Sequence, residues 1–417
     1  MKTLWEVDIA IVGAGPVGSA AALALAQISP NQKVLLIDRE SALKLPPGQI
    51  DLRVFAINSG SKNLFENLGI WPRVVNSRVC AYQHMHVWDA EGSGFVDFSA
   101  DELGVTELGH IAEAGVIQEA LDDLIAQTIN IETLRPVEIE HLAFGENNAE
   151  LTLANGRFVR AGLLVAADGA RSMLRQKAGI EVSEDDCLQK ALVANLRLEK
   201  SHENCAWQIF RPTGPLAFLP LTDVDGPSDS DQNLCSIVWT LDNPVADEVM
   251  SLKAQVFEER LQHAVESRFG RLKLVSDRLA FSLIQRHATT YSQKSMVLLG
   301  DAAHNIHPLA GLGANLGFQD VWALRQELER AFSRNTPLGH PQILARYQRR
   351  RKLDNELALR TMGFFRDAFA DHGILLNAAR NIGFRLFNGI PPVKRFVARH
   401  ALMPQDQFQA NTHKGQP

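Results

Sequence analysis

Two glycine-rich segments, far apart in the sequence, have the residue types and spacing of nucleotide-binding loops. The first is Gly13-Ala14-Gly15-Pro16-Val17-Gly18. The second begins at Gly300-Asp301 and continues through Pro308 to Gly311-Leu312-Gly313-Ala314-Asn315. Glycine lets a backbone turn tightly and approach a phosphate, and the N–H groups at a helix N-terminus favour negative charge. Two such loops in one chain indicate a single long cofactor held at two points, with FAD the first candidate.

The first loop lies where a strand turns into a helix. Gly13 is expected to make the tight turn, Gly15 to let the backbone approach a pyrophosphate, and Gly18 to let helix and strand pack closely. Asp38 follows at the end of the next strand, where an acidic side chain binds a ribose hydroxyl. The alternative interpretation is an ordinary turn followed by a chance acidic residue.

Two further acidic residues, Asp168 and Asp301, each follow a buried apolar run. Strand ends line the ligand crevice of a parallel sheet, so both carboxylates are expected near the cofactor, together with Gly169. Asp301 is predicted to accept a hydrogen bond from a polyol such as the ribityl chain of FAD. The alternative for each is a helix N-cap, which for Asp168 would leave Arg171 and Arg175 in water.

The elements that position these residues are interleaved along the chain. Apolar strands are expected at 7–12, 33–38, 163–168 and 296–299, a helix at 16–28, and hairpins at 82–98 and 139–158. The pattern predicts an α/β protein in which a Rossmann-like FAD-binding domain is interleaved with a β-sheet substrate domain and followed by helices. The expected FAD-binding domain comprises residues 1–75, 105–182 and 285–350, the substrate domain 76–104 and 183–284, and the C-terminal helical region 351–417.

The composition excludes several classes of function. The 417-residue chain has a formal net charge of −6, 46% hydrophobic and 22% charged residues, which argues against a nucleic-acid-binding protein. Its four cysteines form no Cys-x-x-Cys pair, and His84 and His86 have no acidic or cysteine neighbour in sequence, so no metal site is expected. No strongly apolar stretch is long enough to span a membrane, and a cytoplasmic location is expected.

The segments GAGPVG, ADGARSMLR and GDAAHNIHPLAGLGANLG resemble the aromatic-ring flavoprotein monooxygenases of the para-hydroxybenzoate hydroxylase class. The strings LRVFAIN at 52–58, LGIW at 68–71, GHI at 109–111, FLPL at 218–221 and SIVW at 236–239 narrow the resemblance. Together they are similar to the ubiquinone-biosynthesis FAD-dependent hydroxylases, which act on polyprenylated phenols and quinols. Leu312 departs from the family, which usually has glutamine between these two glycines.

The resemblance implies an FAD-binding domain of para-hydroxybenzoate hydroxylase type, with NAD(P)H as a transient co-substrate. It implies that O2 adds to reduced FAD to give a C4a-hydroperoxide. The distal oxygen of this hydroperoxide would then be transferred to a carbon of the substrate ring. Asp168 and Gly169 would contact both FAD and the nicotinamide cofactor, and Arg53 and Gln118 would contact FAD. The alternatives are a surface cation for Arg53 and a solvated helix position for Gln118.

No residue is assigned as catalytic, since the chemistry belongs to the cofactor. His304 and Pro308 are candidates because they lie beside the second glycine loop, although a structural hydrogen bond would equally explain His304. Backbone N–H groups of this loop are expected to stabilise negative charge on the reduced isoalloxazine ring. Two other functions stay open: a flavin dehydrogenase or reductase of the same fold, and a non-catalytic FAD-binding subunit of a quinone-biosynthesis complex.

The last segment carries a separate signal. Residues 372–405 contain five Lys or Arg residues and no Asp or Glu, interleaved with apolar residues. This pattern predicts peripheral contact with an anionic inner membrane or with a partner complex. The alternative is a helical pair packed on the protein. The run Arg349-Arg350-Arg351-Lys352 is interpreted as a solvated helix face.

Overall fold

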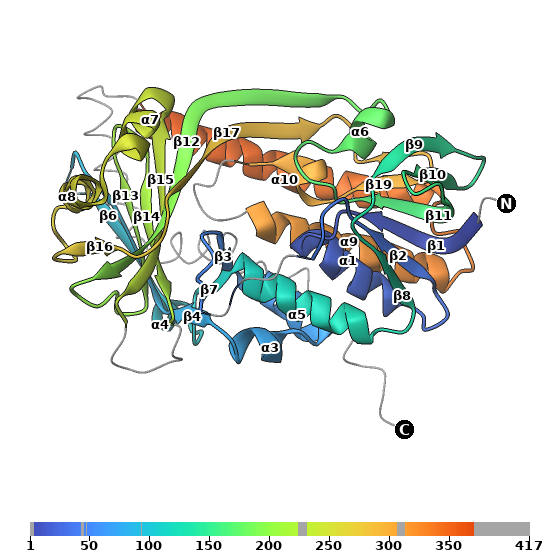
Figure 1. The fold of residues 1–417 in the computed structure, drawn as a ribbon, viewed down its shortest axis with the longest axis horizontal. Coiled ribbons are helices and arrows are strands. Elements are labelled where there is room, and N and C mark those ends of the chain that lie inside the picture. The colour runs from blue at the N-terminus through green and yellow to red at the C-terminus, as the bar shows by residue number, and fades with distance from the viewer. Residues whose placement is uncertain are drawn as a thin grey trace.

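The computed structural model describes residues 4–42, 46, 48–92, 94–223, 232–306 and 313–370, with the backbone alone for 361, 362 and 364–370 (Figure 1). In this part of the chain the strands form an eight-stranded, a nine-stranded and a three-stranded sheet. The two large sheets lie at opposite ends of the molecule, with the small sheet between them (Figure 1).

Most of the eight-stranded sheet is parallel and assembled from three separate stretches of chain. The parallel strands follow the order β19-β11-β1-β2-β8. Their bounds are β1 (Leu4–Val12), β2 (Val34–Ile37), β8 (Ile131–Leu134), β11 (Phe158–Ala166) and β19 (Met296–Leu298). Three antiparallel strands complete it: β9 (Ile139–Phe144), β10 (Ala149–Leu153) and β18 (Ser292–Gln293). The four predicted apolar strands and the hairpin at 139–158 are confirmed.

Helices pack against this sheet and against one another. They are α1 (Pro16–Ala26), α2 (Ser59–Leu68), α3 (Trp71–Val75), α5 (Ala114–Gln127), α6 (Met173–Lys177), α9 (Gly313–Phe332) and α10 (Pro341–Ala370), with a short 3-10 turn η1 (Gly300–Ala302). Helix α1 is buried along nearly its whole length, because its alanines let it lie close to the strands. Its apolar residues share one core with the parallel strands and with α9.

The nine-stranded sheet follows the order β20-β17-β12-β15-β14-β13-β5-β6, with β16 beside β12. Its bounds are β5 (His84–Asp89), β6 (Phe95–Ser99), β12 (Val182–Leu198), β13 (Cys205–Phe210), β14 (Leu216–Leu221), β15 (Leu234–Asp242), β16 (Leu272–Leu274), β17 (Leu279–Ala288) and β20 (His304–Asn305). Helices α7 (Asn243–Ser251) and α8 (Ala254–Ala264) cover its outer face (Figure 1) and form a second core with it. The predicted hairpin at 82–98 is the antiparallel pair β5–β6.

The three-stranded sheet consists of β3 (Val54–Ile57), β7 (Gly109–Glu113) and β4 (Val79–Tyr82), and α4 (Ala100–Leu103) follows β6 nearby. Strand β4, expected in the substrate domain, therefore pairs with β7 of the expected FAD-binding domain. Strand β17 also runs through the expected boundary at 284/285. The α/β fold class with a helical C-terminal part is confirmed, and the domain boundaries stay a prediction.

Candidate cofactor site

The carboxyl ends of three neighbouring parallel strands meet at one edge of the eight-stranded sheet. Val12 of β1 is level with Ala166 of β11, and Ala166 is level with Leu298 of β19. Gly13 directly follows β1, and Asp168 and Gly300 each lie two residues beyond the ends of β11 and β19. The sheet thus brings together segments that the sequence predicted to share one ligand. This edge is where open parallel sheets bind ligands.

The three glycines of the first loop have different surroundings. A Cβ atom at Gly13 would lie 2.2 Å from the carbonyl oxygen of Ala167, and one at Gly18 would lie 1.8 Å from that of Gly13. Close packing therefore demands glycine at both positions. A Cβ at Gly15, the N-cap of α1, would meet nothing within 4 Å. The open space beside a helix N-terminus fits a pyrophosphate.

Asp38 and Gln118 hold this loop from two sides. The Asp38 carboxylate accepts hydrogen bonds from the backbone N–H groups of Ala14 and Glu40. The Gln118 amide nitrogen donates to the carbonyl oxygen of Ala14 at 3.0 Å and to the Ser19 hydroxyl at 3.2 Å. Gln118 is buried, so the alternative of a solvated helix position is wrong. Its buried Oε1 atom has no protein partner among the described residues, which leaves an acceptor for a cofactor hydroxyl group.

The loop after β11 is tied to the turn after β19 by a buried arginine. Arg175 donates to the carbonyl oxygens of Ala302 at 2.8 Å and Ala170 at 3.0 Å, and desolvation by burial lowers its pKa. The alternative that left Arg175 in water is therefore wrong. The Asp168 carboxylate accepts hydrogen bonds from the Ser172 hydroxyl and the Leu174 N–H, while Ser172 caps α6. Asp168 and Gly169 remain partly open to solvent beside Gly13.

Asp301 projects from the η1 turn with its side chain exposed. Protein surrounds the carboxylate on its other sides, and this desolvation raises its pKa, against the opposing effects of His304, an Asn305 hydrogen bond and Arg286. An acceptor that is open on one side and fixed on a short turn is suited to hold a polyol. Contact between Asp301 and a ribityl chain stays a prediction.

The second glycine loop is described only from Gly313 onward. Pro308 and Gly311 lie outside the described residues, as do His307 and Leu312. Gly313 and Ala314 begin α9 and are partly exposed, and a Cβ at Gly313 would meet nothing within 4 Å. The start of α9 therefore has open space beside it, as the prediction of a ligand-facing helix N-terminus requires.

Asn315 contacts strand β3, and Arg53 directly precedes it. The Asn315 side chain is buried; it accepts hydrogen bonds from the Asn58 N–H and the Ser61 hydroxyl and donates to the carbonyl oxygen of Ala56 at 2.7 Å. It thus fixes the start of α9 to β3 and α2. The Arg53 side chain is 60% exposed, and its Nε lies 3.9 Å from Asp51 Oδ1. This leaves the guanidinium open to an anionic ligand.

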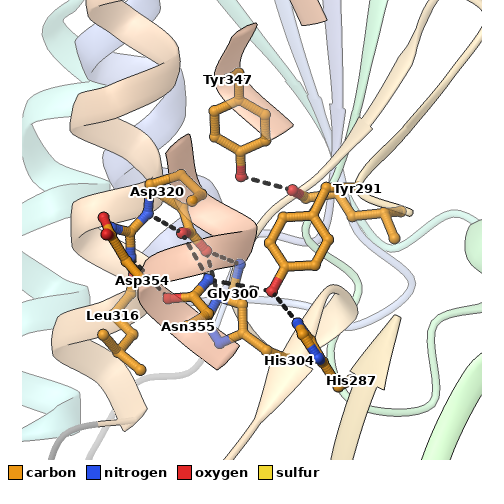
Figure 2. A network of polar contacts seen from close by, with 11 residues as sticks. His287, Tyr291, Gly300, His304, Leu316, Asp320, Tyr347, Asp354 and Asn355 are labelled. Carbon is orange, nitrogen blue, oxygen red and sulfur yellow. Dashed lines mark hydrogen bonds and ion pairs between the residues drawn. The ribbon is translucent and has the colours of Figure 1, made fainter. Parts of the chain in front are cut away.

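His304 is buried below the η1 turn, where its Nε2 contacts Asp320 Oδ2 (Figure 2). Its described contacts are structural, which agrees with the alternative interpretation of this residue. Arg351 also contacts Asp320 and is fully buried, so the prediction of a solvated face for the whole run 349–352 is wrong. Among the described residues, no group of three or more His, Cys, Asp or Glu could hold a metal ion.

Comparisons with known proteins agree with this geometry. The family model of the FAD binding domain matches residues 6–362. A 3-demethoxyubiquinol 3-hydroxylase of Escherichia coli is 35% identical over 95% of this chain and 98% of its own length. The chain belongs to the FAD-dependent ubiquinone-biosynthesis hydroxylases. Another relative, the ubiquinone biosynthesis monooxygenase COQ6 of Danio rerio, is 31% identical over 94% of this chain and 89% of its own.

Solved structures share the fold of this hydroxylase. The p-nitrophenol 4-monooxygenase PnpA of Pseudomonas putida superposes with a TM-score of 0.73 at 17% identity, covering 96% of this chain and 99% of its own. PqsL of Pseudomonas aeruginosa in complex with 2-aminobenzoylacetate gives a TM-score of 0.71 at 19% identity, with 90% of this chain and 99% of its own covered.

The protein is an FAD-dependent hydroxylase that uses NAD(P)H as co-substrate. When bound, FAD supplies the electron transfer and oxygen activation that protein side chains lack. The chain's own residues bind and orient it. Gly15 leaves open space at the N-terminus of α1, Gln118 and Arg175 fix the surrounding loops, and Asp301 presents a carboxylate at the turn after β19. The particular contacts of each residue with FAD stay predictions.

Proposed function

We propose that this hydroxylase inserts one oxygen atom into the aromatic ring of a polyprenyl phenol or quinol of ubiquinone biosynthesis. NAD(P)H and a proton reduce the second oxygen atom of O2 to water, and the ring C–H becomes C–OH. The observation that carries this proposal is the convergence of the three predicted cofactor segments at one sheet edge, next to β20, which joins the nine-stranded sheet and its apolar inner face. Similarity to the ubiquinone hydroxylases along nearly the whole chain supports the substrate class.

The apolar face belongs to the nine-stranded sheet. Phe218 and Ile237 point toward α7 and α8, in the outer core. The residues that alternate with them along β14 and β15 point to the opposite, inner face. Of these, Leu219 and Leu221 of β14 pack with residues of β3 and β7. On this inner face, the paired residues Ala217 and Val238 remain partly exposed. An apolar, partly open surface suits an aromatic ring that carries a prenyl chain, and it keeps water from the reacting atoms.

Oxygen tracing tests the reaction directly. Purified holoenzyme is incubated with NAD(P)H, 18O2 and a prenylated phenol or quinol, and the product is analysed by mass spectrometry. We expect one 18O atom per product molecule. Oxidation of NAD(P)H and substrate without 18O in the product would favour a dehydrogenase or reductase. Bound FAD with no NAD(P)H oxidation for any phenol tried would favour a non-catalytic subunit. The quinone precursor that accumulates when the gene is deleted identifies the ring position.

We also propose that segment 372–405 makes peripheral contact with an anionic membrane or with a quinone-biosynthesis complex. The proposal rests on composition, because this segment lies outside the described residues. None of the helices in the described part of the chain is both long and apolar enough to cross a membrane.

Vesicle flotation tests the membrane contact. Full-length protein is expected to float with vesicles that contain phosphatidylglycerol and to stay behind with pure phosphatidylcholine, because the contact is electrostatic. A variant with Arg380, Arg385, Lys394, Arg395 and Arg399 replaced by glutamine should lose flotation. Equal flotation of this variant would contradict membrane contact through this segment.

A further inference from the structure

A buried ion pair lies directly beneath the turn that presents Asp301. Asp320 of α9 and Arg351 of α10 are both fully buried, and Arg351 Nε lies 2.7 Å from Asp320 Oδ1. The second carboxylate oxygen of Asp320 accepts a hydrogen bond from the Gly300 N–H at 3.0 Å and contacts His304 Nε2 (Figure 2). One carboxylate thus joins the η1 turn, strand β20 and the two C-terminal helices.

The two terminal nitrogens of Arg351 also donate hydrogen bonds. Its guanidinium reaches Asp354 Oδ2 at 2.9 Å, Asn355 Oδ1 at 2.8 Å and the carbonyl oxygen of Leu316 at 3.4 Å. Burial alone would raise the pKa of Asp320, but His304 and Arg351 lower it to about 2. Asp320 therefore stays ionised and keeps its acceptor lone pairs for the Gly300 N–H.

Helix α10 holds the other side of the same turn. The Tyr347 hydroxyl, one helical turn before Arg351, donates to the carbonyl oxygen of Leu298 at 2.8 Å (Figure 2). Leu298 ends β19, two residues before Gly300. Gly300 itself has a φ of +56°, a conformation that other residues rarely adopt. The turn is thus fixed at Leu298 and at Gly300 by residues of α10, directly or through Asp320.

We propose that Arg351 and Asp320 are positioning residues: they set the conformation of the Gly300–Asp301 turn and, through it, the affinity for FAD. The inference rests on the proposed placement of the cofactor beside Asp301. If Arg351 lost its charge, the buried Asp320 carboxylate would keep, among the described residues, only His304 as a neighbour that offsets its desolvation. It would then take up a proton or move toward His304, and either change weakens its hydrogen bond with the Gly300 N–H.

The test compares Arg351→Met with Arg351→Lys and with a matched control, Arg346→Met. Arg346 also joins α10 to α9, through Glu327 at 2.7 Å, but has no described contact with the turn. FAD release from the full-length holoenzyme is followed by the increase in flavin fluorescence after dilution. We expect Arg351→Met to weaken FAD binding about tenfold, Arg351→Lys about threefold, and Arg346→Met less than about twofold. The visible absorption bands of bound FAD should change only in the Arg351 variants.

Two further variants keep the outcome decisive. If Arg351→Met does not fold, Asn355→Leu removes one acceptor of Arg351 and one donor to Asp320 while leaving the Arg351–Asp320 ion pair in place, and it should weaken FAD binding about threefold. Asp301→Ala tests the placement of the cofactor. If Asp301→Ala leaves the affinity for FAD unchanged, that placement is wrong. If Asp301→Ala weakens binding while Arg351→Met lowers only the melting temperature, the placement stands and the positioning role is overturned.

Discussion

At the scale of single residues, two glycines of the first loop are expected to be needed for different reasons, one for close packing and the other for ligand binding. Gly18 leaves no room for a Cβ atom, whereas Gly15 has open space on the side where a Cβ would project. Gly15 also has φ −71° and ψ 178°, which any residue adopts. The two positions therefore make a matched pair for substitution by alanine.

We expect Gly15→Ala to change the free energy of unfolding of the apoprotein by less than about 0.5 kcal/mol. It should nevertheless weaken FAD binding about tenfold or more, because the methyl group occupies the space expected for the pyrophosphate. Gly18→Ala should destabilise the apoprotein by about 1–3 kcal/mol through overpacking. Chemical denaturation and flavin fluorescence measure the two effects. Unaltered FAD affinity in Gly15→Ala would place the pyrophosphate elsewhere.

At the scale of secondary structure, the strands and loops that carry the site could be predicted from the sequence. The buried side chains that hold these loops in place could not. Hydrophobic runs and glycines identify β1, β11 and β19 and the turns after them, because those signals are local. The partners that hold Arg175 and Arg351 across the fold, Ala302 and Asp320, come from distant segments and could not be identified from the local sequence. One indication was available for Arg351: it continues the helical spacing of the buried residues Leu344 and Tyr347.

At the scale of the whole molecule, two buried histidines, one in the three-stranded sheet and one in the loop after β12, make stability sensitive to acid. Burial lowers the pKa of His110, on β7, and of His202, after β12, from 6.5 to about 4. The unfolded chain therefore binds more protons than the folded protein between these values. Above about pH 6.5 neither histidine lowers the free energy of unfolding. As the pH falls toward 4, each histidine lowers the free energy of unfolding by on the order of 3 kcal/mol.

We accordingly expect the unfolding free energy to decrease between pH 6.5 and pH 4. Replacing His110 by glutamine should make this dependence shallower, because the glutamine takes up no proton. Replacement of His141, which is exposed, serves as the control and should leave the slope unchanged. Denaturant unfolding at several pH values measures the slope. An identical slope in the wild type and in His110→Gln would show that His110 already protonates in the folded protein.

The placement of β11 between β1 and β19 has a consequence for biosynthesis. The ribosome delivers β1 and β11 long before β19, and Arg351 emerges later still. A nascent chain that ends before residue 300 contains the first glycine loop and Asp168 but lacks the turn that completes the strand-end edge. Loading of FAD should therefore follow release of nearly the whole polypeptide. Until then the end of β11 that pairs with β19, residues 164–166, needs shielding, as chaperones provide for exposed strand edges.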